Sequence, residues 1–275
     1  MTHEWVDLIL VGSRGRMGKM ISNAAFGDER FSIYAEVEHP DHPSHSDESE
    51  EKIDSDLRDA LTTYQDHDGK GRALVVVSAV NDADTAAGHA AICTEFGVAY
   101  VCGTTGLDDI EQETLKAASK HIPLVYSTNM NAWVIFAIGT AVNFMKLFGK
   151  NVLLEIIDVH HGNKPDSPSG TAVTLYEMIC LVAGRCVDVV IFGRHGKLGP
   201  RTFEEIAVHA LRAGKSFLAE HEFRFYHPDL PEKFVITHSA QAWENYADGF
   251  LQAAMFAAEN PNGMYTQFDV CGFKI

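Results

Sequence analysis

The sequence has few cysteines, few basic residues and no long hydrophobic run. Its five cysteines form no Cys-x-x-Cys pair, which argues against a disulfide framework or a structural zinc site and favours a reducing compartment. Lysine and arginine number 22 against 38 acidic residues, a net charge of -16, and this argues against a surface that binds nucleic acid. No apolar run approaches the roughly 18 residues that span a bilayer, and the acidic N-terminal segment is unlike a signal peptide. We therefore expect a cytoplasmic protein that binds neither nucleic acid nor membrane.

The first half of the 275-residue chain alternates short apolar segments with helical patterns. Such alternation predicts right-handed βαβ units and a parallel, doubly wound α/β sheet of the Rossmann type. The predicted strands cover 7–11, 31–37, 73–80, 98–102 and 123–126, and helical patterns follow them, including 82–95 and 108–120. The acidic segment 39–56 is rich in Ser, Pro and His and predicts a solvated loop.

The pattern changes after Asn131. A long apolar helix is predicted at 132–148, and a strand at 152–159 leads to a helix at 169–182. Further strand-like segments with little helix between them predict a mixed sheet in a smaller α+β domain, at 187–192, 206–211, 216–225 and 234–240. A last helix at 242–259 is expected to return to the first domain. We therefore predict one domain of residues 1–130 and 242–275 and a second of residues 131–241.

A glycine-rich turn follows the first predicted strand. Gly12, Gly15 and Gly18 stand where a dinucleotide-binding fold needs a tight turn and close backbone approach to a pyrophosphate. The spacing departs from Gly-x-Gly-x-x-Gly because Arg14 occupies the usual second glycine position. Glu38 ends the second strand, where a carboxylate accepts hydrogen bonds from ribose hydroxyls. Together these features favour a bound dinucleotide over tight helix–strand packing alone.

Glu38 also bears on the choice of cofactor. A carboxylate beside the ribose repels a 2′-phosphate and favours NADH, whereas Arg14 and Arg16 in the glycine turn leave NADPH open. Two polar segments, Gly103-Thr104-Thr105-Gly106 and Ser127-Thr128-Asn129-Met130, follow later strands, at the carboxyl ends where open α/β sheets bind ligands. Ordinary polar turns have the same composition, so these segments point to a ligand only in combination with the glycine turn.

Residues 160–171, His-His-Gly-Asn-Lys-Pro-Asp-Ser-Pro-Ser-Gly-Thr, gather proton donors in an otherwise acidic chain. Histidine is the commonest acid–base residue, and a lysine ammonium donates a proton or grips a carboxylate. His160 and His161 are adjacent at a strand end and should point to opposite faces, so we expect them to do different work. Lys164 is the candidate proton donor, against the more usual reading of a solvated surface lysine.

The end of the same motif predicts a site for an anion. Ser169 suits the N-cap of the next helix, so that Gly170 and Thr171 offer backbone N–H groups to a carboxylate. Simple capping explains the same residues and is compatible with binding. Metal binding by the two histidines is disfavoured, because only Asp166 lies close by as a further ligand in the sequence. We therefore predict no metal.

Several blocks of the chain resemble one family when they are taken in order. They are Gly15-Arg16-Met17-Gly18, Gly103-Thr104-Thr105-Gly106, His160-His161 through Lys164 to Ser169-Gly170-Thr171, Ala210-Leu211-Arg212-Ala213-Gly214, and Glu220-His221. This order resembles the 4-hydroxy-tetrahydrodipicolinate reductase (dihydrodipicolinate reductase) family of bacterial lysine and diaminopimelate synthesis. The resemblance covers nearly the whole chain, and the His-His-x-x-Lys…Ser-Gly-Thr block is its most specific part.

The resemblance implies NAD(P)H-dependent reduction of 4-hydroxy-tetrahydrodipicolinate, a small dicarboxylate cyclic imine, to tetrahydrodipicolinate with loss of water. It implies His160 as the acid–base residue, Lys164 as the proton donor, and carboxylate binding by His161, Gly170 and Thr171, beside Ser169. It also implies a homotetramer joined through the sheet of the second, substrate-binding domain. The implied cofactor-binding residues are Gly12, Ser13, Arg14, Gly15, Arg16, Met17, Glu38, Gly103, Thr104, Thr105, Ser127, Thr128, Asn129 and Met130.

The chain departs from the family pattern at a few positions. Ser78-Ala79-Val80 replaces a Phe-Thr-like segment that faces the nicotinamide, and Gln241-Ala242 stands where many members carry Ser-Arg. These changes leave open a nucleotide-binding sensor without catalysis. A related NAD-dependent amino-acid dehydrogenase is a second alternative, against which the block from Lys164 to Thr171 argues. The basic segment 193–201 is either a solvated loop or a lid or subunit contact.

Overall fold

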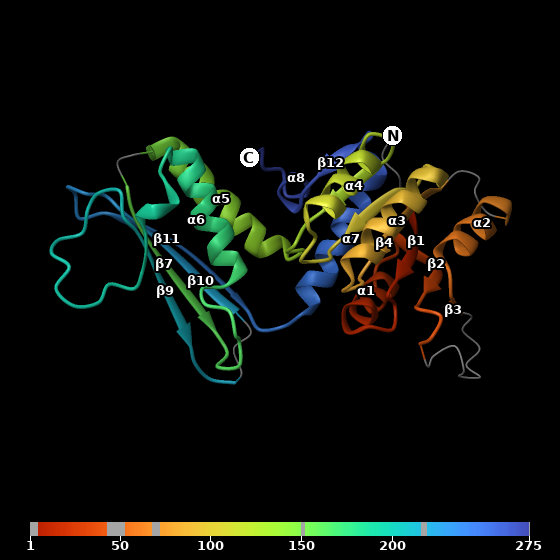
Figure 1. Ribbon diagram of the computed structural model, residues 1–275, viewed down its shortest axis with the longest axis horizontal. Helices are drawn as coiled ribbons and strands as arrows, with labels where there is room; N and C mark the ends of the chain where they lie inside the picture. Colours follow the sequence, from red (N-terminus) through yellow and green to blue (C-terminus); the bar gives the residue numbers. More distant parts are fainter. Residues whose placement is uncertain (1–4, 43–52, 68–71, 150–151, 216–218, 275) are drawn as a thin grey trace. The chain divides into compact units, whose positions relative to one another are not determined.

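The structure is a computed structural model that describes residues 5–42, 53–67, 72–149, 152–215 and 219–274. It divides into two compact units (Figure 1). Unit 1 comprises Met1–Ala132 and Glu244–Lys274, and unit 2 comprises Trp133–Trp243. Within the described ranges, no helix combines the length and the apolar composition that crossing a bilayer requires.

Unit 1 is built on a parallel sheet with the strand order β12-β6-β5-β4-β1-β2-β3. Its strands are β1 (Val6–Val11), β2 (Phe31–Val37), β3 (Ile53–Asp54), β4 (Ala73–Ser78), β5 (Ala99–Cys102), β6 (Pro123–Tyr126) and β12 (Gly263–Tyr265). Its helices are α1 (Arg16–Phe26), α2 (Leu57–His67), α3 (Ala83–Phe96), α4 (Asp109–Ser119), α7 (Glu244–Glu259) and α8 (Gln267–Val270). Because β1 pairs with both β2 and β4, the strand order reverses beside β1, at the switch point where such sheets bind ligands.

The sheet of unit 1 is covered on both faces, which explains why its strands are apolar throughout. Every residue of β1 is buried, as expected for a central parallel strand. Apolar side chains of α1 and α7, such as Ile21 and Phe250, pack on one face. Leu61 of α2, Ala90 of α3 and Leu115 of α4 pack on the other. The two layers of helices leave the carboxyl ends of the strands free to carry a site.

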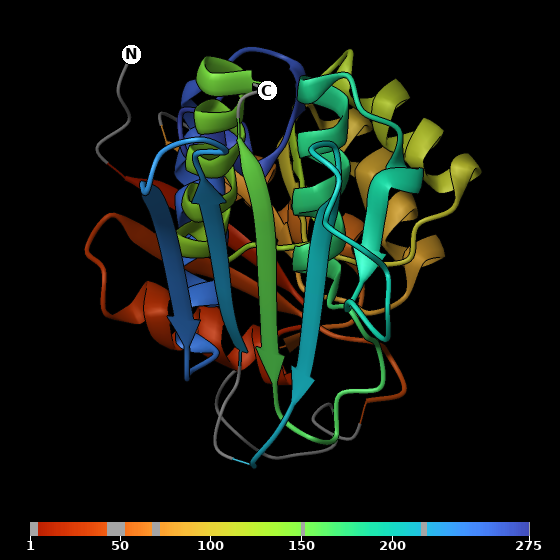
Figure 2. The same cartoon turned by 90° about the vertical axis from the view of Figure 1, so that its left-hand side faces the viewer.

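Unit 2 has a mixed sheet with the strand order β11-β10-β7-β9-β8. Strand β7 runs parallel to β9 and antiparallel to β10. The elements are α5 (Ala132–Phe148), β7 (Leu153–His160), α6 (Gly170–Ala183), a 3-10 turn (Val187–Val189), β8 (Val190–Phe192), β9 (Ile206–Arg212), β10 (Ala219–Tyr226) and β11 (Lys233–Ala240). Figure 2 shows α5 and α6 behind this sheet, and among the described residues no helix of unit 2 covers its other face.

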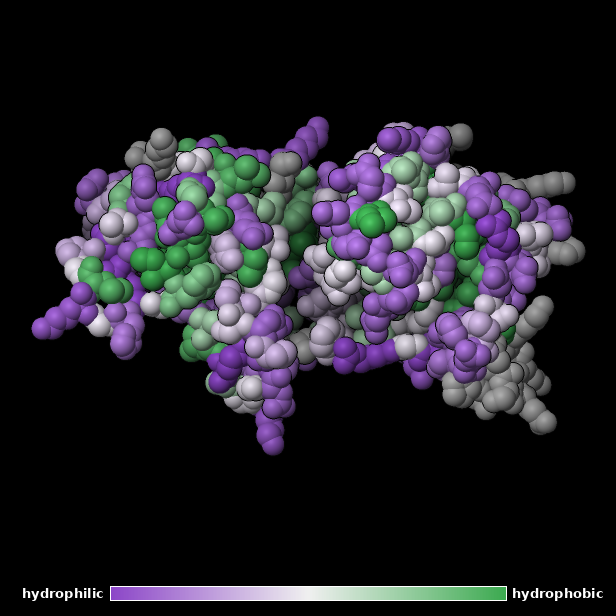
Figure 3. Space-filling view, in the orientation of Figure 1, coloured by the Kyte–Doolittle hydropathy of each residue, from purple (hydrophilic) through white to green (hydrophobic). Residues whose placement is uncertain are grey.

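The covered face of the unit 2 sheet holds its core. Burial alternates along β7, so that Leu154, Ile156 and Asp158 face the helices, in keeping with the two-residue period of a strand. Phe144 of α5 lies 4.7 Å, centroid to centroid, from Phe225 of β10. Most of the exposed large hydrophobic side chains among the described residues belong to unit 2. Figure 3 shows hydrophobic side chains, in green, gathered on the visible face of that unit.

The predicted fold class is confirmed, with a parallel sheet in unit 1 and a mixed sheet in unit 2. The loop predicted at 39–56 is wrong for Ile53–Asp54, which pairs with Glu36 and Val37 as β3. This strand is too short to show an alternating pattern, and it exists only through its pairing. Part of the predicted loop, 43–52, and the first residues of the strand predicted at 216–225 lie outside the described residues. The strand predicted at 187–192 divides into the 3-10 turn and β8.

Candidate active site

The chain between β1 and α1 forms the predicted glycine turn. Gly12 has φ +76°, a left-handed conformation that glycine adopts without a steric penalty. The N–H of Gly15 donates to the carbonyl oxygen of Gly12 at 3.2 Å and closes the turn. A Cβ on Gly18 would lie 2.1 Å from that same oxygen, so a side chain there would push α1 away from the strand. The N-terminus of α1, which begins at Arg16, is thereby held at the end of β1, as an anion site requires.

Glu38 stands beside this turn at the end of β2. Its Oε2 accepts a hydrogen bond of 2.9 Å from the backbone N–H of Arg14. The guanidinium of Arg14 lies 3.0 Å from the carboxylate of Glu36, so its positive charge is engaged on β2. Met17 packs against the core behind the turn, and Ser13 is buried. The Glu38 carboxylate is therefore held at the turn by a backbone N–H, while Glu36 engages the Arg14 guanidinium.

A pocket of about 460 Å³ opens at the carboxyl ends of β1, β2 and β4. Gly12, Gly15 and Glu38 line it, so the structure brings together these three predicted residues. The pocket has the glycine backbone and the acidic end of β2 that a dinucleotide needs, and the residues present fit such a group. Sequence reasoning missed other lining residues, including Asn81, Asp82 and His89. The signal for Asn81 and Asp82 was their position directly after the strand predicted at 73–80.

The two later polar segments follow β5 and β6 at the same edge of the sheet, but they do not line this pocket. Close packing explains the glycine at position 103, because a Cβ there would lie 2.2 Å from Cζ of Phe250. Thr104 donates its hydroxyl to the carbonyl oxygen of Val80 at 2.9 Å, and Thr105 is exposed. The Ser127 hydroxyl donates to the carbonyl oxygen of Asn129 at 2.8 Å. Met130 is buried in the core, and its carbonyl oxygen packs so closely on Gly249 of α7 that a Cβ there would lie 1.6 Å from it.

In unit 2, residues 160–171 connect the end of β7 to the start of α6. His160 is the last residue of β7 and is buried, whereas His161 lies just beyond the strand and is half-buried. Ser169 is the N-cap of α6 and accepts a hydrogen bond of 3.3 Å from the N–H of Ala172. Nζ of Lys164 lies 2.9 Å from Oδ1 of Asp166. Two proton donors and a helix N-terminus therefore share one end of unit 2.

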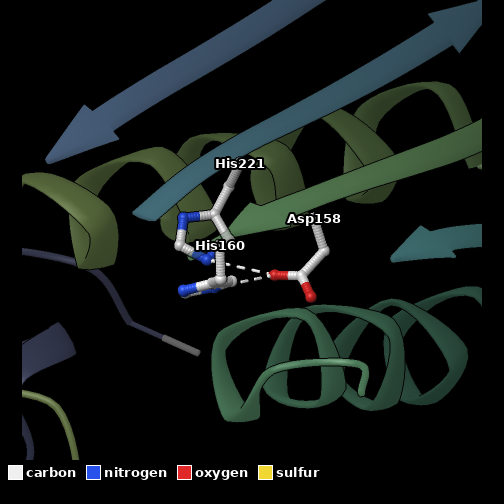
Figure 4. A group of neighbouring side chains, drawn as sticks. All are labelled: Asp158, His160 and His221. Atoms are coloured by element: carbon white, nitrogen blue, oxygen red, sulfur yellow. Dashed lines mark ion pairs between the residues drawn. The ribbon is translucent and has the colours of Figure 1, made fainter. Parts of the chain in front are cut away.

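Asp158 lies at the centre of this arrangement, two residues before His160 on β7 (Figure 4). Its Oδ1 is 3.1 Å from Nε2 of His160 and 3.5 Å from Nε2 of His221. Ser169 donates its hydroxyl to Oδ1 at 2.6 Å and its backbone N–H to Oδ2 at 2.9 Å. Nη2 of Arg212 lies 3.1 Å from Oδ2. The carboxylate thus touches four neighbours from β7, β9, β10 and the N-terminus of α6.

The charges of this cluster follow from burial and hydrogen bonding. Burial alone would raise the pKa of the Asp158 carboxyl, but hydrogen bonds from His160 and Ser169 hold that pKa far below its usual value. Burial lowers the pKa of His221 to about 3, so this imidazole is neutral at physiological pH. Asp158 is therefore an anion and His221 an uncharged neighbour.

Three side chains here could also hold a metal ion. One possible ligand atom from each of Asp158, His160 and His221 lies within 4.8 Å of the other two. The guanidinium of Arg212 already neutralises the carboxylate, so a cation added here would face electrostatic repulsion. The donor set fits an acid–base site better than a metal site.

Sequence reasoning missed Asp158, Arg212 and His221 as site residues. The spacing of Asp158 from His160 was a signal, since side chains two apart on a strand share a face.

Comparisons with known proteins cover both units. The family described as "Dihydrodipicolinate reductase, N-terminus" matches residues 6–130, and "Dihydrodipicolinate reductase, C-terminus" matches residues 134–271. The chain is 32% identical over 270 residues to a 4-hydroxy-tetrahydrodipicolinate reductase of Anaeromyxobacter sp. (strain Fw109-5), covering 98% of each chain. It is also 32% identical over 275 residues to the enzyme of the same description from Acinetobacter baumannii (strain ATCC 17978), covering 96% of each.

A solved structure extends the likeness to three dimensions. It is described as dipicolinate-bound dihydrodipicolinate reductase from Paenisporosarcina sp. TG-14, and it superposes with a TM-score of 0.77. The two chains are 19% identical, and the match covers 95% of this chain and 97% of the other. At that identity the likeness establishes the fold.

Proposed function

The chain belongs to the dihydrodipicolinate reductase family, and from this premise we propose that it reduces 4-hydroxy-tetrahydrodipicolinate to tetrahydrodipicolinate. It is an NAD(P)H-dependent oxidoreductase of lysine and diaminopimelate biosynthesis. The observation that carries the proposal is the motif 160–171, in which His160, Lys164 and the capped N-terminus of α6 share one end of unit 2. The family likeness does not favour an amino-acid dehydrogenase or a non-catalytic sensor.

Residues 1–130 and 242–275 are the proposed dinucleotide-binding domain. When bound, NADH or NADPH supplies a hydride from C4 of its nicotinamide. The glycine turn at Gly12 and Gly15 is proposed to hold the pyrophosphate through its backbone and through the N-terminus of α1. Glu38 is proposed to accept hydrogen bonds from the adenosine ribose. The remaining proposed contacts are Ser13, Arg14, Arg16, Met17, Gly103, Thr104, Thr105, Ser127, Thr128, Asn129 and Met130.

Residues 131–241 are the proposed substrate-binding and oligomerisation domain. Lys164 is proposed to donate the proton that accompanies reduction, and His160 to act as the acid–base residue. His161, Ser169, Gly170 and Thr171 are proposed to hold a substrate carboxylate at the N-terminus of α6, where the helix dipole favours an anion. This assignment divides the motif between proton transfer and binding.

We propose that NADH is the slightly favoured cofactor. Support comes from the Glu38 carboxylate, which lines the pocket, and from the Arg14 guanidinium, which is engaged by Glu36. A 2′-phosphate near Glu38 would meet a negative charge without a matching cation from Arg14. Binding of NADPH more than about tenfold tighter than NADH, roughly 1.4 kcal/mol, would contradict this preference.

The proposed homotetramer is joined through the sheet of unit 2. Support comes from the face of that sheet that is turned away from α5 and α6 (Figure 2). On β7 this face carries Glu155 and Ile157, which are only partly buried, and Glu155 pairs with Arg201. Exposed apolar area of this kind is typical of interaction surfaces. Light scattering after size-exclusion chromatography should give about four times the 30.3 kDa chain mass, and a monomer at micromolar concentration would refute the assembly.

The activity is tested directly with the condensation product of aspartate semialdehyde and pyruvate. We expect the protein to oxidise NADH or NADPH when this substrate is added. The loss of absorbance of the reduced nicotinamide measures the oxidation. Aspartate and homoserine, tested with NAD⁺, are expected to give no reduction. Cofactor binding without any turnover would instead support the non-catalytic sensor.

A further inference from the structure

Asp158 is a charged side chain that the proposed mechanism does not use. It is fully buried, with 0% of its surface exposed. A carboxylate in that position is stable only if charge and hydrogen-bond partners replace the lost water. Ser169, His160 and Arg212 supply those partners. The four contacts described above make Asp158 the common neighbour of the proposed acid–base residue and of the residue that caps α6.

Arg212 extends this connection to the segment that carries Lys164. It ends β9 and stands directly opposite His160 in the register of β7 and β9. Its Nη2 donates to Oδ2 of Asp158 at 3.1 Å and to the carbonyl oxygen of Asp166 at 2.6 Å. The N–H of Ala213 donates to the carbonyl oxygen of His160 at 2.9 Å. The Arg212 guanidinium thus links the Asp158 carboxylate to the loop that carries Lys164.

We propose that the buried Asp158 and the partly buried Arg212 form a positioning pair, which holds His160, the Lys164 loop and the N-terminus of α6 in one catalytic arrangement. This rests on the proposed function, because it assigns the pair to the reduction. Neither residue touches the reacting atoms. Their contribution is geometric, since a displacement of about 1 Å in a catalytic group costs roughly a hundredfold in rate.

Single and double variants can distinguish a positioning pair from a purely structural ion pair, because charge balance affects stability while catalysis depends on the contacts themselves. Removing one partner leaves the other charge without its counter-charge, which destabilises the fold, whereas removing both restores neutrality. The double variant Asp158→Asn/Arg212→Met should therefore recover thermal stability relative to either single variant. It should not recover catalysis, because the contacts that position His160 and the Lys164 loop remain lost.

The experiment compares Asp158→Asn, Arg212→Met and the double variant as full-length protein. We expect kcat to fall about a hundredfold in each, and affinity for pyridine-2,6-dicarboxylate, measured by calorimetry, to fall about tenfold because the capped N-terminus of α6 is displaced. KM for NADH should stay unchanged, because unit 1 is not altered. Arg212→Lys, which keeps the positive charge, should have a kcat between that of the wild type and that of Arg212→Met.

Asp7→Asn is the matched control. Asp7 is also a buried carboxylate, 3.2 Å from Arg72 and 2.9 Å from the hydroxyl of Tyr64, but it lies in unit 1 at the amino end of β1. This control should lower the melting temperature without changing kcat or dicarboxylate affinity. If the double variant of Asp158 and Arg212 regains kcat together with its melting temperature, the pair is structural only and the proposal fails.

Failure of the proposed function has a different signature. A wild-type protein that oxidises neither cofactor with the substrate refutes the reduction, while the dicarboxylate affinities still test the pair. Wild-type kinetics and wild-type affinity in both single variants refute the pair alone. Loss of wild-type activity on adding a chelator, together with a bound metal that is absent from Asp158→Asn, also overturns the proposal, because Asp158 would then be a metal ligand.

Discussion

At the scale of single residues, Lys164 carries the chemistry that is most directly open to test. Its ammonium lies 2.9 Å from Asp166, so it is held at the motif and does not extend into solvent. Replacing it with alanine removes the proposed proton donor and should lower kcat by about a hundredfold or more. Steady-state oxidation of NADH with the cyclic substrate measures the change.

Lys116→Ala provides the matched control for this prediction. Lys116 lies on α4 in unit 1 and pairs with Glu113 at 3.4 Å on an exposed surface. Its removal should leave kcat and KM at wild-type values. Lys164→Ala with wild-type kcat would remove Lys164 from the mechanism while leaving the family assignment in place.

Glu38 sets a second prediction at this scale, on cofactor preference. Glu38→Gln keeps a hydrogen-bond acceptor beside the glycine turn but removes the charge that opposes a 2′-phosphate. The ratio of the Kd values for NADPH and NADH should shift towards NADPH by about tenfold, or roughly 1.4 kcal/mol. Fluorescence titration of both cofactors measures the ratio, and no shift would show that Glu38 does not discriminate.

At the scale of elements, the glycine turn between β1 and α1 makes the sharpest structural demand. A Cβ at Gly18 would stand 2.1 Å from the Gly12 carbonyl oxygen and 2.7 Å from Cα of Ser13. Gly18→Ala should therefore cost about 1–3 kcal/mol in the free energy of unfolding, because the backbone has to shift. It should also weaken dinucleotide binding, as titration and denaturant unfolding can show.

Gly88→Ala on α3 is the control for this effect. A Cβ at Gly88 would meet no atom within 4 Å, and alanine is the better helix former by up to about 1 kcal/mol. The two variants should therefore change stability in opposite directions. Equal effects would mean that the close approach of α1 to Gly12 is not what requires glycine.

The same elements show how far local pattern predicts structure. The strand and helix at 123–126 and 132–148 have the predicted bounds, because an apolar run ended by polar residues is a complete local signal. Helices α2 and α8 and strands β3 and β12 were not predicted. Strand β3 contains two residues and is defined by its pairing with β2. Such an edge strand has no pattern of its own, so the sequence contains no signal for it.

At the scale of the whole molecule, buried histidines predict sensitivity to acid. Burial lowers the pKa of His221 to about 3 and that of His89 to about 4. In the unfolded chain a histidine takes up a proton near pH 6.5. Between that pH and the lowered values the unfolded state binds more protons than the native state, so the free energy of unfolding falls as the pH falls. For His221 alone the slope is roughly 1.4 kcal/mol per pH unit.

Thermal unfolding at pH 7.5, 6.0 and 5.0 tests this prediction. We expect the melting temperature to fall steadily below about pH 6.5, and His221→Gln to reduce the slope. The contribution of Asp158 has a different window, because a lowered carboxyl pKa stabilises the native state at all pH values above its usual range. A melting temperature that is constant from pH 7.5 to 5.0 would contradict the burial of these two imidazoles.

The sequence by itself determined the parts of this protein that depend on neighbours along the chain. These are the parallel βαβ pattern, the glycine turn at Gly12, and the motif in which His160 and Ser169 flank Lys164. Only the tertiary structure decided that Asp158 meets Arg212, 54 residues away, and His221 on the next strand. The physical reason is strand register. Pairing of β7 with β9 and β10 places these side chains together, and no local pattern specifies which strands pair or how they align.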